Sequence, residues 1–213
     1  METVGLRERK KQRTRDALVR AAVELFTSQG YDRTTVDEIA AAVDVSQRTF
    51  FRYFAGKDEA ALALHDLSVA HFLRALHSRP PHEPPLEALR RAVLDGWDRI
   101  SEAIEDVVPV DLYLRMYRLV ESTPVLLAAH LRRSAETEEE IARLIARREG
   151  LDVDADPRPR VAVALFGGVL RVTERQWSAR GDLSLDAMRD LTAAHLDHIG
   201  PALAGNWRST VET

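Results

Sequence analysis

The sequence predicts an all-α protein with about nine helices. Along most of its 213 residues the apolar side chains recur at the three- and four-residue spacing of an amphipathic helix. No segment shows a convincing alternating strand pattern, and helix-favouring residues such as alanine, leucine and arginine dominate the composition. The chain is 45% hydrophobic and 30% charged, which is typical of a folded globular protein.

The first three expected helices are short and closely spaced. The first runs from Thr14 to Ser28 and is followed by Gly30, a typical residue just past a helix end. Thr35, with a glutamate three residues later, has the capping-box pattern of a second helix. Two residues after that helix, Ser46 is a suitable cap for a third. Three helices within about 55 residues, the last two joined by a tight turn, indicate a helix-turn-helix module.

The rest of the chain is expected to form six longer helices. One follows the module and ends near Ser78, where the proline-rich connector RPPHEPP (79–85) begins. The other five have helical periodicity, and several have recognisable start or stop residues: Leu86–Glu105, Pro109–Ser122, Pro124–Glu149, Pro159–Arg180 and Ser184–Ala204. This division predicts a helix-turn-helix domain over 1–56 and a second helical domain over 57–213.

The net charge of −4 is unevenly distributed. Residues 1–57 carry 11 Lys and Arg against 8 Asp and Glu, so the remainder of the chain carries −7. Six of these basic residues lie in the run Arg7–Arg15. A basic end on an acidic body suggests a polyanionic partner, although a solvated helix start would look the same. The basic, polar start and the lack of a long apolar run lead us to expect a cytoplasmic protein with no membrane partner.

The third helix has two different faces. At about 100° per residue, Phe50 and Phe54 share one stripe, and Arg48 and Arg52 lie on roughly the opposite side. Arginine can pair with guanine, and a glutamine such as Gln47 can pair with adenine. The side chains around this face that suit phosphate oxygens are Ser46, Thr49, Tyr53, Lys57 and, at the start of the second helix, Thr35. An ordinary amphipathic helix with exposed arginines is the alternative interpretation.

The segment LVRAAVELFTSQGYDRTTVDEIAAAVDVSQRTFFRYFAGKDE resembles the N-terminal DNA-binding domain of the TetR family of transcriptional regulators. The resemblance covers about residues 10–60, and the matching positions are Ala21-Ala22, Leu25-Phe26, Gly30-Tyr31, Thr34-Thr35-Val36, Ile39-Ala40, Val45-Ser46, Thr49-Phe50-Phe51, Tyr53-Phe54 and Lys57. Two departures are Asp44, where the family usually has glycine, and Ala55-Gly56, where Pro-Ser is frequent. Asp tolerates the left-handed backbone conformation better than most residues, so we expect the turn to survive.

The resemblance implies a role for each residue of this segment. The side chains expected on phosphates are Thr35, Thr49, Tyr53 and Lys57. Those expected nearest the bases are Gln47, Arg48 and Phe51, and those expected in the core are Phe50 and Phe54. The family pattern leaves open whether Arg52 reaches a base, a phosphate or only water.

The segment VAVALFGGVL (161–170) is apolar all round, so a helix there needs cover on every side. Glycine in a helix interior costs about 1 kcal/mol, and we considered close helix approach, room for a ligand, or a kink as reasons for Gly167-Gly168. The resemblance implies a homodimer in which this helix and Ser184–Ala204 form a four-helix bundle. The residues expected at this interface are Val161, Leu165, Gly168, Val172, Leu191 and His195.

The resemblance also places an effector pocket among the middle helices. The candidate ligand-binding residues are Trp97, Tyr113, Met116, Tyr117 and Phe166, with Trp177 as a weaker candidate. Ordinary core positions are the alternative for each. Together they indicate a mostly apolar effector. The sequence TFFRYF and the proline-rich connector are similar to features of a TetR subgroup thought to bind acyl-CoA-like ligands.

Catalytic and metal-site patterns are weak. His195 and His198 lie on one helix side, but no third ligand is evident, so no metal or cofactor is expected. The absence of cysteine excludes disulfides and thiolate chemistry, and no nucleophile or phosphate-loop motif occurs. We therefore expect a non-enzymatic DNA-binding regulator, a repressor that an effector releases from a palindromic double-stranded DNA operator. The alternatives are an effector-independent DNA-binding protein of the same fold, or a carrier or enzyme with a vestigial DNA-binding module.

Overall fold

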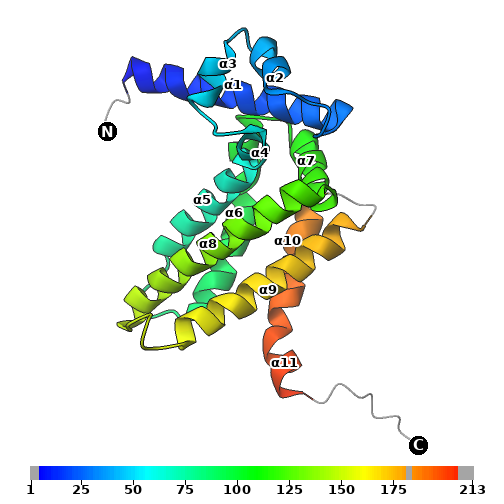
Figure 1. The fold of residues 1–213 in the computed structure, drawn as a ribbon. Coiled ribbons are helices and arrows are strands. Elements are labelled where there is room, and N and C mark those ends of the chain that lie inside the picture. Colours follow the sequence, from blue (N-terminus) through cyan, green and yellow to red (C-terminus); the bar gives the residue numbers. More distant parts are fainter. Residues whose placement is uncertain (1–4, 181–183, 206–213) are drawn as a thin grey trace, which may run out of the picture. The chain divides into compact units, whose positions relative to one another are not determined.

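The computed structural model describes residues 5–180 and 184–205, and Figure 1 shows that these residues fold almost entirely into helices. The eleven helices of this described part are α1 (Leu6–Gln29), α2 (Val36–Ala42), α3 (Gln47–Phe51), α4 (Lys57–Ala61), α5 (Ala63–His77), α6 (Pro85–Glu105), α7 (Val110–Ser122), α8 (Pro124–Glu149), α9 (Arg158–Ser178), α10 (Leu185–Asp197) and α11 (Ile199–Ala204). The all-α prediction is confirmed. Among the described residues, no helix is both long and apolar enough to cross a membrane.

Two of the nine expected helices are each divided in two. The helix after the module is interrupted at Leu62, and the last helix is interrupted at His198. The second break has a physical cause in Pro201, because a proline ring clashes with the carbonyl four residues earlier, which here belongs to Asp197. The first helix also differs from expectation, since it begins at Leu6 and so includes the basic run.

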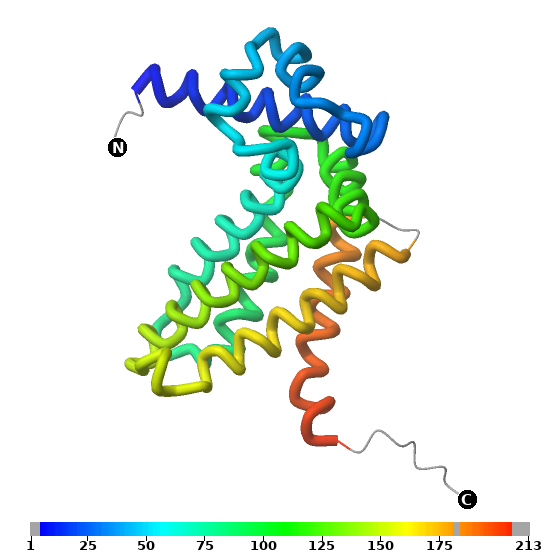
Figure 2. Tube along the Cα trace, in the orientation of Figure 1, coloured from blue at the N-terminus to red at the C-terminus, as the bar shows by residue number. Residues whose placement is uncertain are grey.

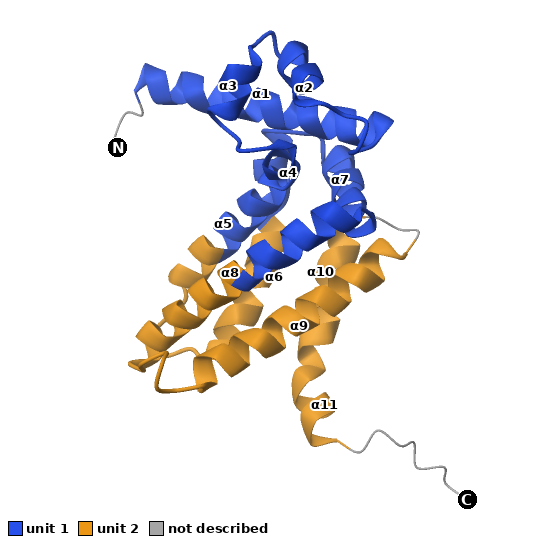
Figure 3. Ribbon diagram, in the orientation of Figure 1, with its two compact units in different colours: residues 1–72, 99–135 blue, residues 73–98, 136–213 orange. Residues whose placement is uncertain are grey.

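The chain divides into two compact units (Figure 3). The first contains Met1–Phe72 and Arg99–Ala135, and the second contains Leu73–Asp98 and Glu136–Thr213. The first unit therefore holds the segment predicted to bind DNA together with α4, α7 and parts of α5, α6 and α8. The functional boundary expected after residue 56 stays a prediction.

The core of the first unit is built on the second half of α1. Leu18, Ala22 and Phe26 are fully buried along one side of this helix, and Phe50 is fully buried on the inner side of α3. Burying a leucine or phenylalanine side chain contributes roughly 1.5–3 kcal/mol. The Phe26 ring also packs on Tyr31 at 5.2 Å between ring centroids, which fixes the loop that leads to α2.

The second unit is organised around the packing of α9 on α10. Trp177 is buried, and its indole N–H donates a hydrogen bond of 3.1 Å to the Ser184 carbonyl. The Thr173 hydroxyl and the Nδ1 atom of His195 are 2.8 Å apart. Burial lowers the pKa of His195, with smaller contributions from Arg180 and His198. These polar contacts fix the register of the two helices.

The proline-rich connector is held by ion pairs within the second unit. Glu83 is buried and accepts hydrogen bonds of 2.8 Å from two nitrogens of Arg79 and one of 2.7 Å from Arg91. The hydrogen bond from Arg79 is the main reason that the pKa of Glu83 is lowered. Arg148 adds a hydrogen bond of 2.9 Å to the Pro80 carbonyl. The connector is therefore fastened by buried and half-buried charges.

Gly167 makes room for a side chain of α8 within the same unit. A Cβ atom at this position would collide with the Glu138 carboxylate, which pairs with Arg171. A Cβ atom at Gly168 would meet only open space and the end of Arg171. The space at Gly167 is therefore taken by the Glu138 side chain of α8, and the reason for the glycine pair stays a prediction.

Candidate DNA interface and effector cavity

Helix α2 is stabilised at its start and at the turn that follows it. Thr35 accepts a hydrogen bond of 3.2 Å from the Glu38 amide, and the Glu38 carboxylate accepts one of 2.8 Å from the Thr35 amide. This reciprocal pair is the expected capping box, and the hydrogen bond from the Thr35 amide is the main cause of the lowered pKa of Glu38. At the other end, Asp44 adopts the left-handed conformation with φ of 54°. The aspartate therefore fills the turn position as expected.

Helix α3 is fixed by a cap and by aromatic packing. The Ser46 hydroxyl accepts a hydrogen bond of 3.2 Å from the Thr49 amide and lies 3.0 Å from the Thr49 hydroxyl. The Phe50 and Phe54 rings are buried and pack 5.4 Å apart. Since both rings are buried, the residues between them must present the opposite side of the chain to solvent.

The exposed face of α3 carries the side chains predicted to contact DNA. Ser46, Gln47, Arg48, Phe51 and Arg52 are exposed, and the remaining two predicted positions here, Thr49 and Tyr53, are half-buried. Half of the Phe51 side chain is open to solvent, although its ring meets Phe50 edge to face at 5.6 Å. A cationic, amide and aromatic surface of this kind can hydrogen-bond to base edges and phosphates. The individual base and phosphate assignments stay predictions.

Arg52, whose role the sequence left open, folds back on its neighbour. Its guanidinium carbon lies 5.1 Å from the centre of the Tyr53 ring, and its Nη2 atom is 3.4 Å from the Tyr53 hydroxyl. This contact holds the Tyr53 side chain beside the exposed face.

Lys57, predicted to contact a phosphate, makes a different contact in the structure. Its ammonium donates hydrogen bonds to the carbonyls of Tyr31 at 2.8 Å and Thr34 at 3.0 Å, and it lies 4.2 Å from the centre of the Tyr31 ring. Burial, with smaller effects of Asp58 and Asp32, raises the pKa of Tyr31 to about 12. The start of α4 is therefore fastened to the loop between α1 and α2. A phosphate contact by Lys57 would need these bonds to be exchanged.

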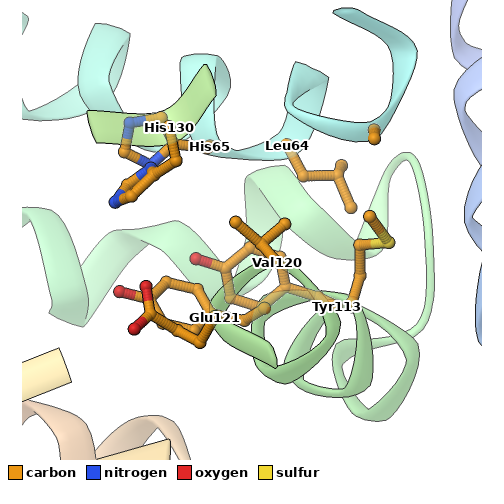
Figure 4. A pocket seen from close by; sticks show the side chains of 9 residues that line it. Leu64, His65, Tyr113, Val120, Glu121 and His130 are labelled. Atoms are coloured by element: carbon orange, nitrogen blue, oxygen red, sulfur yellow. The ribbon is translucent and has the colours of Figure 1, made fainter. Parts of the chain in front are cut away.

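A small cavity lies in the same unit (Figure 4). It is lined by one residue of α4, two of α5, five of α7 and one of α8: Ala61, Leu64, His65, Tyr113, Met116, Tyr117, Val120, Glu121 and His130. In Figure 4, His65, His130 and Glu121 lie toward one end of the cavity and Leu64 toward the other. The His65 and His130 rings meet edge to face at 4.4 Å. The cavity volume is about 20 Å³, which is room for a single water.

Three of the five predicted ligand-binding residues line the cavity. Tyr113, Met116 and Tyr117 line it, and their contact with a ligand stays a prediction. Trp97 and Phe166 belong to the second unit and are not among the lining residues. The sequence interpretation missed the two histidines and Glu121, because a lone histidine on a helix gives no local sign of facing a cavity.

The predicted dimer face on α9 is open in the single chain. The side chains of Val161 and Val172 are 55% and 51% exposed, and Leu165 and Gly168 between them are half-buried. The two predicted interface residues of α10 are not open in the same way. Leu191 is buried within its own chain, and His195 contacts the Thr173 hydroxyl. The apolar stripe of α9 is therefore the available part of the predicted interface.

Two family models together match most of the chain. The model described as bacterial regulatory proteins of the tetR family matches residues 18–64. The model described as the MftR C-terminal domain matches residues 83–203.

Similar proteins cover almost the full length. The chain is 48% identical over 204 residues to the HTH-type transcriptional regulator TcmR of Streptomyces glaucescens, covering 96% of this chain and 90% of the relative. A transcriptional regulator from Aquifex aeolicus aligns with a TM-score of 0.54 at 15% identity, over 87% of this chain and 99% of the other. The SmeT–triclosan complex aligns with a TM-score of 0.58 at 19% identity, over 87% and 90%. The two structural matches support the fold alone.

Proposed function

Because the chain belongs to the TetR family of transcriptional regulators, we propose that it is a homodimeric repressor released from a palindromic DNA operator by a small, mostly apolar effector. The exposed face of α3 reads base edges, and the hydroxyl groups around it position the module on phosphates. A two-fold dimer matches half-sites one helical turn apart, and the open stripe of α9 supplies the apolar surface that such a dimer buries. A DNA operator as partner places the protein in the cytoplasm.

The observation that carries the proposal is the position of α4. Its first residue, Lys57, is bonded to the loop that precedes α2, and its last residue, Ala61, lines the cavity. Five residues therefore connect the DNA-binding module to the cavity within one compact unit. A movement of α4 at the cavity is transmitted to the module through the hydrogen bonds of Lys57.

The cavity volume explains why binding has to move its walls. Ligand pockets usually enclose about 300–1,000 Å³, whereas this cavity has a volume of about 20 Å³. An effector enters only after α4 and α5, or α7 and α8, separate. Ligand binding thus selects an open conformation, and a coupling of about 1–3 kcal/mol changes operator affinity 5–150-fold.

The lining suggests an effector with an apolar body and one polar end. Leu64, Met116 and Val120 offer apolar contact, and His65, His130 and Glu121 offer hydrogen-bonding groups. An acyl-CoA-like ligand, as the subgroup resemblance implies, stays a prediction, as does any other hydrophobic effector.

A ligand screen tests this function. Compounds that raise the melting temperature are added to the protein bound to a palindrome selected from random DNA, and release is followed by fluorescence anisotropy. His65→Gln is expected to raise the effector concentration needed for release while leaving effector-free operator affinity unchanged. His77→Gln, an exposed change on the same helix, is the control. Stabilising ligands that never release DNA would show that induction is wrong.

A second candidate function is effector-independent DNA binding by the same fold. The observation in its favour is that the protein's own side chains nearly fill the cavity. This function predicts that operator binding is tight and that no small molecule raises the melting temperature.

A further inference from the structure

The first turns of α1 extend beyond the packed part of the module (Figure 2). Every residue from 6 to 13 is exposed, and 82% of the Leu6 side chain is open to solvent. The first fully buried residue of this helix is Leu18. The stretch from Leu6 to Thr14, which we call the basic arm, therefore gains no stability from a hydrophobic core.

The charges of the basic arm oppose its own helical conformation. Five of the seven residues from Arg7 to Arg13 are basic, and Glu8 is the only acid among them. Cations near the N-terminus of a helix interact unfavourably with the helix dipole. Within the described part of the chain, Arg7, Lys10 and Lys11 make no hydrogen bond or ion pair through their side chains. A bound polyanion would remove this electrostatic penalty.

The geometry of α1 directs one row of these charges toward the α3 side of the module. The Arg15 guanidinium carbon lies 5.3 Å from the centre of the Phe54 ring, just after the end of α3. Arg7 and Lys11 precede Arg15 at four-residue intervals, and they lie three and two turns before the buried residue Leu18. They therefore continue the side of α1 that packs in the module. Arg9 and Arg13 lie on a different side.

We propose that the basic arm is a second DNA contact, in which Arg7 and Lys11 bind backbone phosphates beside those contacted around α3. At a rise of about 1.5 Å per residue, the arm carries Lys11 about 6 Å and Arg7 about 12 Å beyond Arg15, or up to about four base pairs along the duplex. The tetR family model matches residues 18–64, so Arg7 and Lys11 both precede the residues that this model matches. The inference rests on the proposed function, because it needs operator binding.

Paired charge removals test the arm in the full-length protein. Operator affinity is measured by anisotropy between 50 and 300 mM salt for Arg7→Gln/Lys11→Gln and for Arg9→Gln/Arg13→Gln. The first pair is expected to weaken binding on the order of 10- to 100-fold at 0.15 M salt. Each lost phosphate contact should lower the slope of log affinity against log salt by about 0.9. Two lost contacts in each protomer of a dimer should therefore lower the slope by close to four. The second pair removes equal charge from another side and should change affinity less than about threefold.

Footprinting distinguishes a localised phosphate contact by the basic arm from a general electrostatic attraction to DNA. Hydroxyl-radical protection by wild-type protein should include phosphates about four base pairs from those protected by α3, and the first double variant should lose only that protection. Equal losses from both double variants with an unchanged footprint would overturn the inference, as would unchanged affinity and slope in the first. Failure of the proposed function is distinct, since wild-type protein would then select no palindrome.

Discussion

The exposed face of α3 and the exposed stripe of α9 differ in their chemistry. The α3 face carries Gln47, Arg48 and Arg52, which water solvates well when no partner is present. The α9 stripe exposes Val161 and Val172, whose contact with water is unfavourable until another surface covers them. The first face is suited to reversible, salt-dependent binding, and the second is suited to a lasting contact between copies of the chain.

The largest expected effect comes from a charge in the apolar stripe. Leu165→Glu would place one unpaired carboxylate per protomer in the predicted dimer interface, at a cost of about 3 kcal/mol each. The dimer dissociation constant should then rise on the order of 10⁴-fold, as measured by sedimentation equilibrium. Ala135→Glu adds the same charge to an exposed position on α8 and should leave the dimer intact. A dimer unaffected by the change at Leu165 would show that α9 is not its interface.

A smaller effect is expected from the base-reading position of α3. Arg48→Ala should cost about 1–3 kcal/mol at one operator base pair and relax the preference there, which competition with single-substitution operators would measure. Arg52→Ala is the matched comparison, because that guanidinium lies on the Tyr53 ring. Similar, sequence-independent losses from both changes would contradict the division of roles between the two arginines.

A substitution of Lys57 tests whether its ammonium supports the fold beside the α3 face or contacts a phosphate. Because its ammonium joins α4 to the loop before α2, Lys57→Met should lower the free energy of unfolding by about 1–3 kcal/mol. Chemical denaturation measures this loss, and the salt slope of operator binding should not change. A slope reduced by about two, from one lost contact per protomer of the dimer, would instead place the ammonium on a phosphate, as the family resemblance implies.

The smallest expected effect is a pH dependence in the second unit. The folded-state pKa of His195 is lowered by burial, so the unfolded chain binds more protons and stability falls as the pH drops below about 6.5. Thermal melts between pH 5 and 8 should therefore show a weaker pH dependence for His195→Asn. The exposed change His82→Gln is the control and should melt with wild-type pH dependence.

The module was predictable because its signals are local. The Thr35 cap, the aspartate in the turn and the Phe50–Phe54 stripe each depend on residues within four positions of one another. The break before α11 was missed, although its signal is equally local, since Pro201 lies four residues after Asp197. Local patterns therefore identified the exposed face of α3, whose contact with DNA stays a prediction.

The cavity and the Lys57 contact were not predictable, because they depend on distant segments meeting. Lys57 bonds to a carbonyl 26 residues earlier, and His65 packs on His130 from another helix. Helical periodicity shows that a residue faces inward, but it does not show which neighbour the residue meets. The predicted roles of Trp97 and Phe166 illustrate this, because both are aromatic and inward-facing by pattern and neither lines the cavity.

The small volume of the cavity has a consequence for the dose response of the regulator. When only a small fraction of molecules is open, the apparent dissociation constant equals the intrinsic one divided by that fraction. Substitutions in α4 or α7 that never touch the effector can then shift the concentration at which genes respond, by changing how often the walls separate. Sensitivity to the signal could therefore evolve, or be engineered, without altering which molecule is recognised.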